Sequence, residues 1–490
     1  MTGSITFKGT PLAGVTVVAY DTNTNSVFQN TTTDAAGHYS FAGLQTGCNC
    51  VLNYQLFAAK PGYSFHPWLA SDPQSAQAGY QFDPSPQNWY VTGGTALTRA
   101  DYNGVFTNPN GGAGIVFDVV NIMSVVGNSV VGANFDAYDG SNPPVRLAAT
   151  GQRLSYAGGD DAAAGKGVAW PATRFIDNQD GTVTDQLSGL VWLKNAGCFA
   201  PTAWANALAE VGRLASGACG LADGSKAGQW RMPNAVELES LVDVAAMAPA
   251  LTPGHPYTDV ASGIYWTSTA YFGGQQGTTS AWAVNLADGS YVNDSVRNLM
   301  ASSQNGVWAV RGTGGGAVQL QASGAYVPFA PGDDGSARKG APLPAPRMLD
   351  NGNGTVTDTL TGLVWLKQAN CIQQPWAAAL ATVGKLAHGQ CGLSDGSAAG
   401  DWRMPNRLEM LSLADRSQNN QALYFDESFV SGQPPIPSQP AAFTGMVAYQ
   451  YYWTSTTDAA SIDQAWTVFS CDFGVYGFPK SSASYTLAVR

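Results

Sequence analysis

Charged side chains are scarce in this chain. Lys, Arg, Asp and Glu make up 12% of its 490 residues, the formal net charge is −11, and no segment is rich in lysine and arginine. Nucleic-acid binding depends on neutralising phosphates with basic side chains. The sequence therefore predicts no nucleic-acid partner.

The chain also lacks a long hydrophobic run. No apolar stretch approaches the roughly 20 residues that cross a bilayer as a helix, so we expect no transmembrane segment. The first residues, MTGSITFKG, do not resemble a signal peptide. We therefore expect either that a leader has been removed or that export takes an unusual route.

Recognisable catalytic constellations are missing as well. The four histidines are scattered along the chain, at His38, His66, His255 and His388. The sequence contains no His-x-x-x-His pair, no nucleophile elbow and no phosphate-binding glycine loop. We therefore predict that the protein is not an enzyme and that it holds no cofactor, apart from a calcium ion considered below.

What the sequence does contain is one module written twice. Residues 177–198 and 350–371 are identical at 16 of 22 positions, and WRMPN at 230–234 returns at 402–406. A unit of this length can bury its own core, so each copy is expected to be a domain. The predicted organisation is a first domain at 1–138, a linker at 139–148, copy one at 149–314 and copy two at 315–490.

Each copy has a pair of cysteines at corresponding positions. Cys198 and Cys219 in copy one match Cys371 and Cys391 in copy two. They are interpreted either as one disulfide per copy, worth roughly 3 kcal/mol each by loop entropy, or as four buried thiols. Structural disulfides indicate an oxidising compartment, so the disulfide interpretation places the protein outside the cell or on its surface. The sequence assigns no role to Cys48, Cys50 and Cys471.

Strand patterns dominate the first domain. SITF, GVTVVAY and HYSF alternate apolar and polar residues between Gly, Asn and Asp turns. This pattern resembles the carboxypeptidase-regulatory and Cna-B-like families, which implies an all-β Ig-like sandwich serving as a spacer or stalk. Residues 123–138 are expected to form its last hairpin, and residues 60–115 an insertion.

Three aspartates near the start of copy one suggest two alternatives. Asp177, Asp180 and Asp185 could supply the carboxylate oxygens that calcium prefers. Their spacing does not match an EF-hand loop, because Gly181 falls at the fifth position and no glutamate follows. An Asp-Gly sequence is also a strong hairpin signal. A tight turn is therefore the preferred interpretation, and a bound calcium ion the alternative.

Helix and strand patterns then alternate in each copy. Trp204, Leu208, Val211 and Ala215 form an apolar stripe at helical spacing. Asn234 with Glu237, repeated as Asn406 with Glu409, fits a capping box at the start of a second helix. Strand-like segments follow at 265–269, 281–286 and 307–311, and in copy two at 452–456, 465–469 and 487–490. Each copy is thus predicted to be an α+β unit.

Together, DNxxGTVTD, GLVWLK, the cysteine pair, WRMPN, YWTST and the final AVR resemble the DUF1566 family, named after the C-terminal domain of a Legionella collagen-like adhesin. The resemblance covers both copies and implies C-type-lectin-like domains in surface or secreted proteins that bind ligands. The expected fold is therefore an Ig-like all-β sandwich followed by two tandem α+β lectin-like domains.

The two copies differ most near the C-terminus, where residues 469–487 are rich in Tyr, Phe, Ser and Gly. This composition is typical of binding loops. The predicted ligand contacts are Phe469, Ser470, Asp472, Phe473, Tyr476, Phe478, Lys480, Ser482 and Tyr485. The favoured function is an adhesin that binds a glycan or another cell-surface ligand. The alternative is a self-associating subunit of an extracellular filament or sheath.

The same segment resembles the diversified C-termini of lectin-fold variable proteins from diversity-generating retroelements. Every residue from 469 to 487 except Lys480 can be encoded by a codon ending in C, as randomised AAC codons would give. An unpaired Cys471 also fits a randomised position. The segment is therefore interpreted either as hypervariable or as an ordinarily diverged surface loop.

Overall fold

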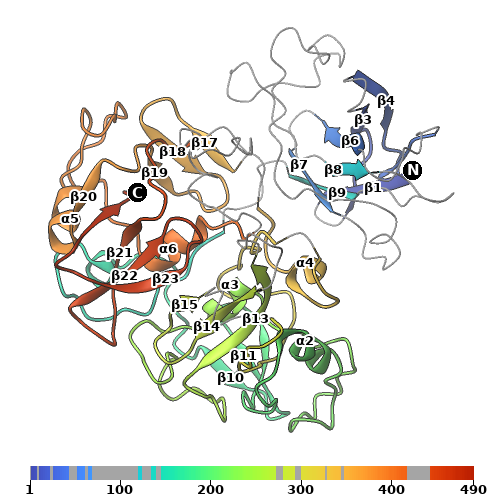
Figure 1. Cartoon of the computed structure of the whole chain (residues 1–490), viewed down its shortest axis with the longest axis horizontal. Coiled ribbons are helices and arrows are strands. Elements are labelled where there is room, and N and C mark those ends of the chain that lie inside the picture. Colours follow the sequence, from blue (N-terminus) through green and yellow to red (C-terminus); the bar gives the residue numbers. More distant parts are fainter. Residues whose placement is uncertain are drawn as a thin grey trace. The chain divides into compact units, whose positions relative to one another are not determined.

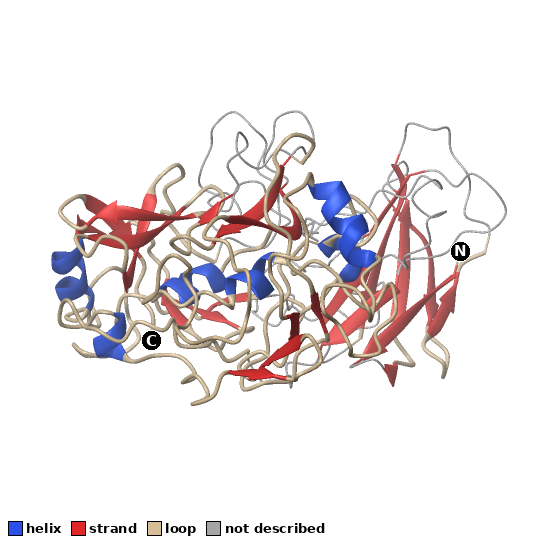
Figure 2. Cartoon of the chain, turned by 90° about the horizontal axis from the view of Figure 1, so that it is seen from below, coloured by secondary structure: helices blue, strands red, loops and turns tan. Residues whose placement is uncertain are grey.

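The computed structural model shows a mostly β protein with few helices, in two compact units (Figures 1 and 2). Unit 1 comprises Met1–Pro144, Pro344–Leu349 and Gln433–Pro440, and unit 2 comprises the remainder, including most of both copies. The structure describes residues 2–7, 10–21, 26–42, 52–60, 64–68, 120–123, 134–138, 145–271, 280–292, 300–325, 328–343, 347–416 and 442–490. Most of the expected insertion at 60–115, together with Cys48 and Cys50, lies outside these residues.

Unit 1 contains two β-sheets. The first comprises β1 (Thr2–Phe7), β2 (Thr10–Pro11), β5 (His38–Ser40), β7 (Ser64–Trp68) and β9 (Asn134–Tyr138). The second has the order β4 (Ser26–Thr32), β3 (Thr16–Asp21), β6 (Leu52–Ala59) and β8 (Val120–Met123).

Most of the expected terminal hairpin at 123–138 lies outside the described residues, which include only Met123 and 134–138 of it. β8 pairs with β6 in one sheet, whereas β9 pairs with β1 and β7 in the other. The strand expected at the end of this segment is confirmed by β9, but strand periodicity carries no information on which neighbour a strand will choose.

Copy one carries two groups of strands. One sheet has the order β10 (Phe175–Asp177), β11 (Thr182–Asp185), β12 (Val191–Leu193) and β16 (Val310–Arg311). The other group comprises β13 (Ile264–Tyr271), β14 (Ser280–Asn285) and β15 (Tyr291–Val292).

Copy two repeats this plan. β17 (Met348–Asp350) precedes the paired strands β18 (Thr355–Asp358) and β19 (Val364–Leu366). Its remaining strands are β20 (Ile372–Pro375), β21 (Tyr451–Thr457), β22 (Gln464–Phe469), β23 (Val475–Pro479) and β24 (Ala483–Thr486).

One eight-stranded sheet runs through both copies, in the order β13-β14-β15-β23-β22-β21-β24-β20. The copies join where β15 pairs antiparallel with β23, with Tyr291 opposite Val475. The two copies are therefore not structurally independent, because backbone hydrogen bonding is continuous between them.

The helices are short: α1 (Asp161–Ala164), α2 (Trp204–Gly212), α3 (Ala235–Glu239), α4 (Asp334–Ala337), α5 (Trp376–Val383) and α6 (Arg407–Ser412). The predicted stripe of α2 is confirmed at Trp204, Leu208 and Val211, which are buried, while Ala215 lies beyond the helix. Both predicted capping boxes, on α3 and α6, are present. Among the described residues, no helix combines the length and apolar character needed to cross a bilayer.

The predicted disulfides are confirmed. Cys198 bonds to Cys219 and Cys371 bonds to Cys391. Each bond ties the segment after the GLVWLK strand to the loop before the WRMPN block, so it closes the framework around α2 or α5. Two disulfides are compatible with an extracellular location.

Each copy also extends an N-terminal arm onto the other copy. We define the first arm as residues 150–165 and the second arm as residues 323–338. In the first arm, the buried Asp161 carboxylate accepts hydrogen bonds from Thr150 of its own copy (2.6 Å) and from Thr456 in β21 of copy two (2.7 Å). Gln152 of the same arm accepts the backbone N–H of Thr457 (2.7 Å).

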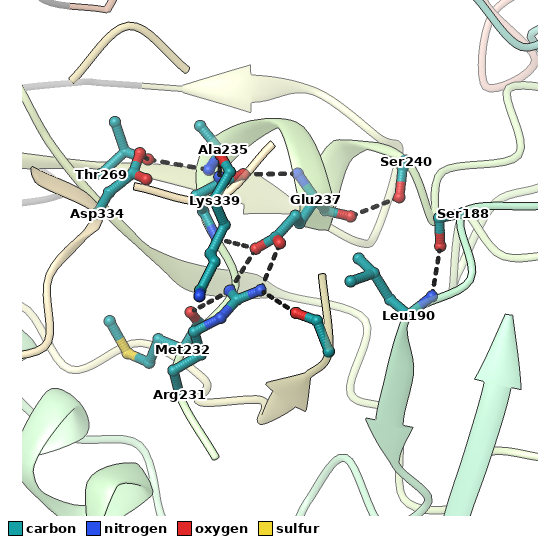
Figure 3. Close-up of polar contacts among 12 residues, drawn as sticks. Ser188, Leu190, Arg231, Met232, Ala235, Glu237, Ser240, Thr269, Asp334 and Lys339 are labelled. Atoms are coloured by element: carbon teal, nitrogen blue, oxygen red, sulfur yellow. Dashed lines mark hydrogen bonds and ion pairs between the residues drawn. The ribbon is translucent and has the colours of Figure 1, made fainter. Parts of the chain in front are cut away.

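The second arm makes the reciprocal contact. Asp334 accepts hydrogen bonds from Ser323 of its own copy and from Thr269 in β13 of copy one, the latter at 2.6 Å. Figure 3 shows Thr269 also accepting the backbone N–H of Ala235 at the start of α3. The arms are therefore exchanged within one chain, in a pseudo-symmetric arrangement that neither copy could complete alone.

Candidate ligand-binding face

The C-terminal segment 469–487 is a β-structure and not the loop that its composition suggested. β23 pairs along its whole length with β22, and β24 pairs with β20. A tight turn at 469–474 connects β22 to β23, with Phe473 donating its N–H to Phe469 and Phe469 donating to Gly474. Most of the segment thus serves the sheet that holds the copies together.

A cluster of aromatic rings lies on one face of β21, β22 and β23. We call it the aromatic row; its members are Tyr449, Tyr451, Phe469, Tyr476 and Phe478. The register places Tyr451 opposite Phe469, and Tyr476 and Phe478 project two residues apart on the same face of β23. All five side chains keep some contact with solvent.

Ring contacts make the aromatic row continuous. Tyr451 stacks on Phe478 with centroids 4.9 Å apart and meets Tyr476 edge-on at 6.1 Å. It also contacts Phe469 at 5.1 Å, and Phe469 contacts Tyr449 at 6.5 Å. Phe478 touches the fully buried Trp453, so the row is anchored on the core of copy two. The result is a preorganised apolar surface that carries three phenol groups, those of Tyr449, Tyr451 and Tyr476.

Tyr449 is the most exposed ring of the row, with 66% of its surface accessible. Its backbone adopts the left-handed conformation (φ 58°), which is rare for a residue other than glycine. Its N–H donates to the sulfur of Cys471 (3.2 Å), and the adjacent Gln450 and Ser470 exchange backbone and side-chain hydrogen bonds. Cys471 forms no disulfide and supports this turn; burial raises the pKa of its thiol.

Two predicted contact residues lie beneath the surface. Phe473 and Ser470 are each 1% exposed. Arg416 donates to the carbonyl oxygens of Asp472 (2.7 Å) and Phe473, which fixes the turn from below. The prediction that the Phe473 and Ser470 side chains touch a ligand therefore needs correction: they shape the turn and leave the contact surface to their neighbours.

The remaining predicted contacts are spread around the row. Lys480 donates to Thr457 and to the carbonyl of Ile462, both at 2.9 Å, and its ammonium lies over the Trp376 ring. Burial lowers its pKa. Tyr485 stacks on Tyr452 at 5.5 Å, on the far side of β21 in the sheet order. Asp472 accepts the N–H of Gly474, and Ser482 is partly exposed after β23.

Two members of the row, Tyr449 and Tyr451, were missed by the sequence analysis. They precede the segment in which the copies differ, and only the register between β21 and β22 brings them beside Phe469. The run AYQYYW at 448–453 was the available signal, because an aromatic cluster at the start of a strand places alternate rings on one face.

The face of the shared sheet opposite the aromatic row is closed by a cation–π contact in each copy. Trp282 stacks on Tyr291 with centroids 4.7 Å apart, and the guanidinium of Arg416 covers both rings, 4.1 Å from the first and 4.6 Å from the second. Both aromatic side chains are buried. Trp466, the counterpart of Trp282, is covered in the same way by Arg407 in copy two, at 4.6 Å. The register places Ile264, Asn285 and Val292 of copy one at the positions of Tyr451, Phe469 and Tyr476, so copy one has no aromatic ring at these matching positions.

The three aspartates proposed for calcium do not come together. Asp177 pairs with Lys194 (2.7 Å), which lowers the pKa of the carboxyl. Asp180 accepts from the N–H and hydroxyl of Thr182, and the buried Asp185 pairs with Arg174 (3.0 Å). Within the described ranges, no group of three His, Cys, Asp or Glu side chains is placed to hold a metal. The tight turn accounts for these carboxylates, and the calcium interpretation is not supported.

A family model for the Lcl C-terminal domain matches the chain twice, at residues 181–311 and 354–490. A search of curated proteins finds no match. The two matches together cover more than half of the chain and coincide with the repeated module and its disulfides. The chain therefore belongs to the Lcl C-terminal domain family, as a protein with two tandem copies of that domain.

Proposed function

We propose that the protein is a secreted or surface-displayed adhesin that binds a glycan through the aromatic row. The observation that carries this proposal is the continuous, partly exposed set of rings on β21–β23, where copy one has Ile264, Asn285 and Val292 at the positions of Tyr451, Phe469 and Tyr476. Aromatic rings offer rigid contact area at low conformational cost, and the phenol groups of Tyr449, Tyr451 and Tyr476 add hydrogen bonding. Membership of the Lcl C-terminal domain family is consistent with a surface-associated role.

The chemistry of the face favours an uncharged sugar over a polyanion. The chain carries a net charge of −11, and Lys480, the cation nearest the row in sequence, is held by Thr457, Ile462 and Trp376. Stacking of the apolar faces of sugar rings on Tyr451, Tyr476 and Phe478 needs no cation. We therefore infer a neutral glycan as the ligand class, bound without metal and without catalysis.

A glycan array tests this proposal. The full chain should bind a subset of neutral glycans, and Tyr451→Ala combined with Tyr476→Ala should reduce binding at least about tenfold, because each lost aromatic anchor costs more than about 1 kcal/mol. Phe329→Ala is the matched control, since this ring is 47% exposed on the second arm. Equal binding by the double variant and the parent, or binding only to sulfated glycans, would refute the proposed site.

The hypervariable interpretation applies to only part of the segment. Val475 pairs across the junction with Tyr291, and Phe473 is buried, so both positions are constrained by packing. Phe469 and Tyr476 are partly exposed, whereas Phe478 packs against the buried Trp453, so the first two are the positions that we expect to vary most easily. A template repeat beside the gene that differs only at adenines, at codons for exposed positions, would support diversification; its absence would favour ordinary divergence.

The exchanged arms favour a second candidate function. A chain that docks Asp161 and Asp334 on the opposite copy could dock them on a second chain, which is a route to self-association. A chain that associates with further copies of itself in this way would be a subunit of an extracellular filament. Sizing of the purified protein separates the two functions: a monomer or a small closed oligomer supports the adhesin, and concentration-dependent fibres support the filament.

A further inference from the structure

A cavity lies at the junction of the two copies, apart from the aromatic row. Its volume is about 80 Å³ and its walls are mostly apolar. Its lining includes residues from matching positions of the repeat: Leu147 and Leu320, and Val236 and Leu408. These four side chains are only partly buried. The arm-proximal segments and the two capped helices, α3 and α6, thus build a pseudo-symmetric opening.

The polar wall of the cavity is not symmetric. Glu239 lines it, where copy two has Leu411 at the matching position. One oxygen of Glu239, Oε1, accepts from Arg407 of copy two at 2.8 and 3.1 Å. The other oxygen, Oε2, has no hydrogen-bond partner among the described residues, although Glu239 is only 6% exposed.

A second acceptor lines the same cavity. Gln321 is 5% exposed and donates through Nε2 to the carbonyl of Ser412 (3.0 Å). Its Oε1 lacks a partner within the described part of the chain. A buried acceptor without a donor keeps the full cost of its desolvation. The buried hydroxyl of Tyr291 lines the same cavity and also lacks a partner among the described residues, so an occupant that both donates and accepts a hydrogen bond would satisfy all three atoms.

The charges around the cavity define the occupant further. Arg407 and Arg416 contribute two positive charges near the single carboxylate of Glu239, so an ammonium ion would be repelled. A carboxylate would place its oxygens against the two unpartnered acceptors. A neutral hydroxyl or amide group supplies the donor without either conflict, and the apolar walls suit a short hydrocarbon body.

We propose that this cavity binds a small uncharged molecule that has an apolar body and a hydroxyl or N–H donor directed at Glu239 and Gln321. The site goes beyond the glycan face, because it lies between the copies and uses none of the rings of the aromatic row. Its ligand would bridge copy one and copy two near Tyr291, on the strand β15 that pairs with β23 of copy two.

The test uses the full chain and four probes that share a short alkyl skeleton: n-butanol, its isomer methyl propyl ether, n-butylamine and n-butyrate. Saturation-transfer NMR titrations at neutral pH should show saturable binding of n-butanol. The ether lacks a donor and should bind about fivefold more weakly, which corresponds to one hydrogen bond of about 1 kcal/mol. The two ions should bind more weakly still.

Two variants make the result specific to the cavity. Leu408→Trp fills the opening and should abolish butanol binding, whereas the matched control Ile462→Trp, at a position 61% exposed, should leave it unchanged. Glu239→Gln should reduce the preference for butanol over the ether. Equal saturation by butanol and ether, or unchanged binding in Leu408→Trp, would show that solvent satisfies the acceptors and would overturn the proposal.

Discussion

At the scale of single residues, the WRMPN block is a hydrogen-bonded clamp. Arg231 binds both oxygens of Glu237 at 2.6 Å, and Glu237 closes the capping box by accepting the N–H of Asn234 (Figure 3). Copy two repeats this arrangement with Arg403, Glu409 and Asn406. Arg231 also donates to the carbonyl oxygens of Met232 and Gly312, so both of its terminal nitrogens are engaged in structural contacts.

Loss of this arginine should be costly. We expect Arg231→Ala to lower the free energy of unfolding by about 3 kcal/mol, because Glu237, with 4% side-chain exposure, would be left as a buried carboxylate without its cation. Urea denaturation followed by tryptophan fluorescence measures the change. Lys194→Ala is the control: it removes the more exposed Lys194–Asp177 pair and should cost less than about 1 kcal/mol. Equal effects would contradict the clamp.

At the scale of elements, local patterns predicted local structure. The capping boxes, the stripe of α2, the strands β13, β14, β21 and β22, and the cysteine pairing all depend on residues near one another in sequence or at matching places in the repeat. The final AVR segment was expected as a strand, yet Val489 forms only isolated bridges to Trp365 and Arg403. Boundaries of this kind depend on partners that the segment itself does not specify.

The exchange of the arms could not be predicted in this way. Asp161 and Thr456 are separated by 295 residues, and nothing in the sequence of either arm distinguishes docking on its own copy from docking on the other. The aromatic row and the cavity could not be predicted either, because both are formed by segments that are distant in the sequence. The row depends on the register of β21, β22 and β23 within copy two, and the cavity depends on the packing of one copy against the other, whereas the composition of 469–487 alone suggested a free loop.

The exchanged arms should make stability depend on pH. Burial raises the pKa of both Asp161 and Asp334 from 3.8 to about 6, against the opposing hydrogen bonds from Thr and Ser hydroxyls. A raised carboxyl pKa means that the folded state holds the proton more tightly than the unfolded state. Their contribution is therefore fully present below about pH 3.8, is lost as pH rises to about 6, and is constant above it.

The measurement is a difference between the parent and Asp161→Asn with Asp334→Asn. Over the interval from pH 4 to pH 7 the parent should lose stability relative to the double variant, on the order of 3 kcal/mol per aspartate. Asp463→Asn is a control of opposite sign, since hydrogen bonding lowers the pKa of that exposed carboxyl. A difference that does not change with pH would show that the buried aspartates do not titrate as the arm contacts require.

At the scale of the whole chain, the two family domains of unit 2 are joined by backbone hydrogen bonds between strands and by an ion pair. β15 joins β23, the arms cross in both directions, and Arg407 of copy two reaches Glu239 and the carbonyl of Gly289 in copy one. Arg407 has Ala235 as its counterpart, and Glu239 has Leu411. The duplicated sequences have therefore diverged at the junction, where each copy now supplies what the other lacks.

Because the two copies are joined in this way, we expect a substitution that destabilises one copy to destabilise the other as well. Replacing Cys371 and Cys391 by serine should destabilise copy two by roughly 3 kcal/mol. Because the sheet and arms are shared, amide hydrogen exchange in β13 and β14 of copy one should accelerate by a comparable free energy, since the slowest amides report unfolding of the whole cooperative unit. The reciprocal variant, with serine at Cys198 and Cys219, should accelerate exchange in β21 and β22. If each variant affected only its own copy, the two domains would unfold independently, and the continuous sheet and crossed arms would not couple them.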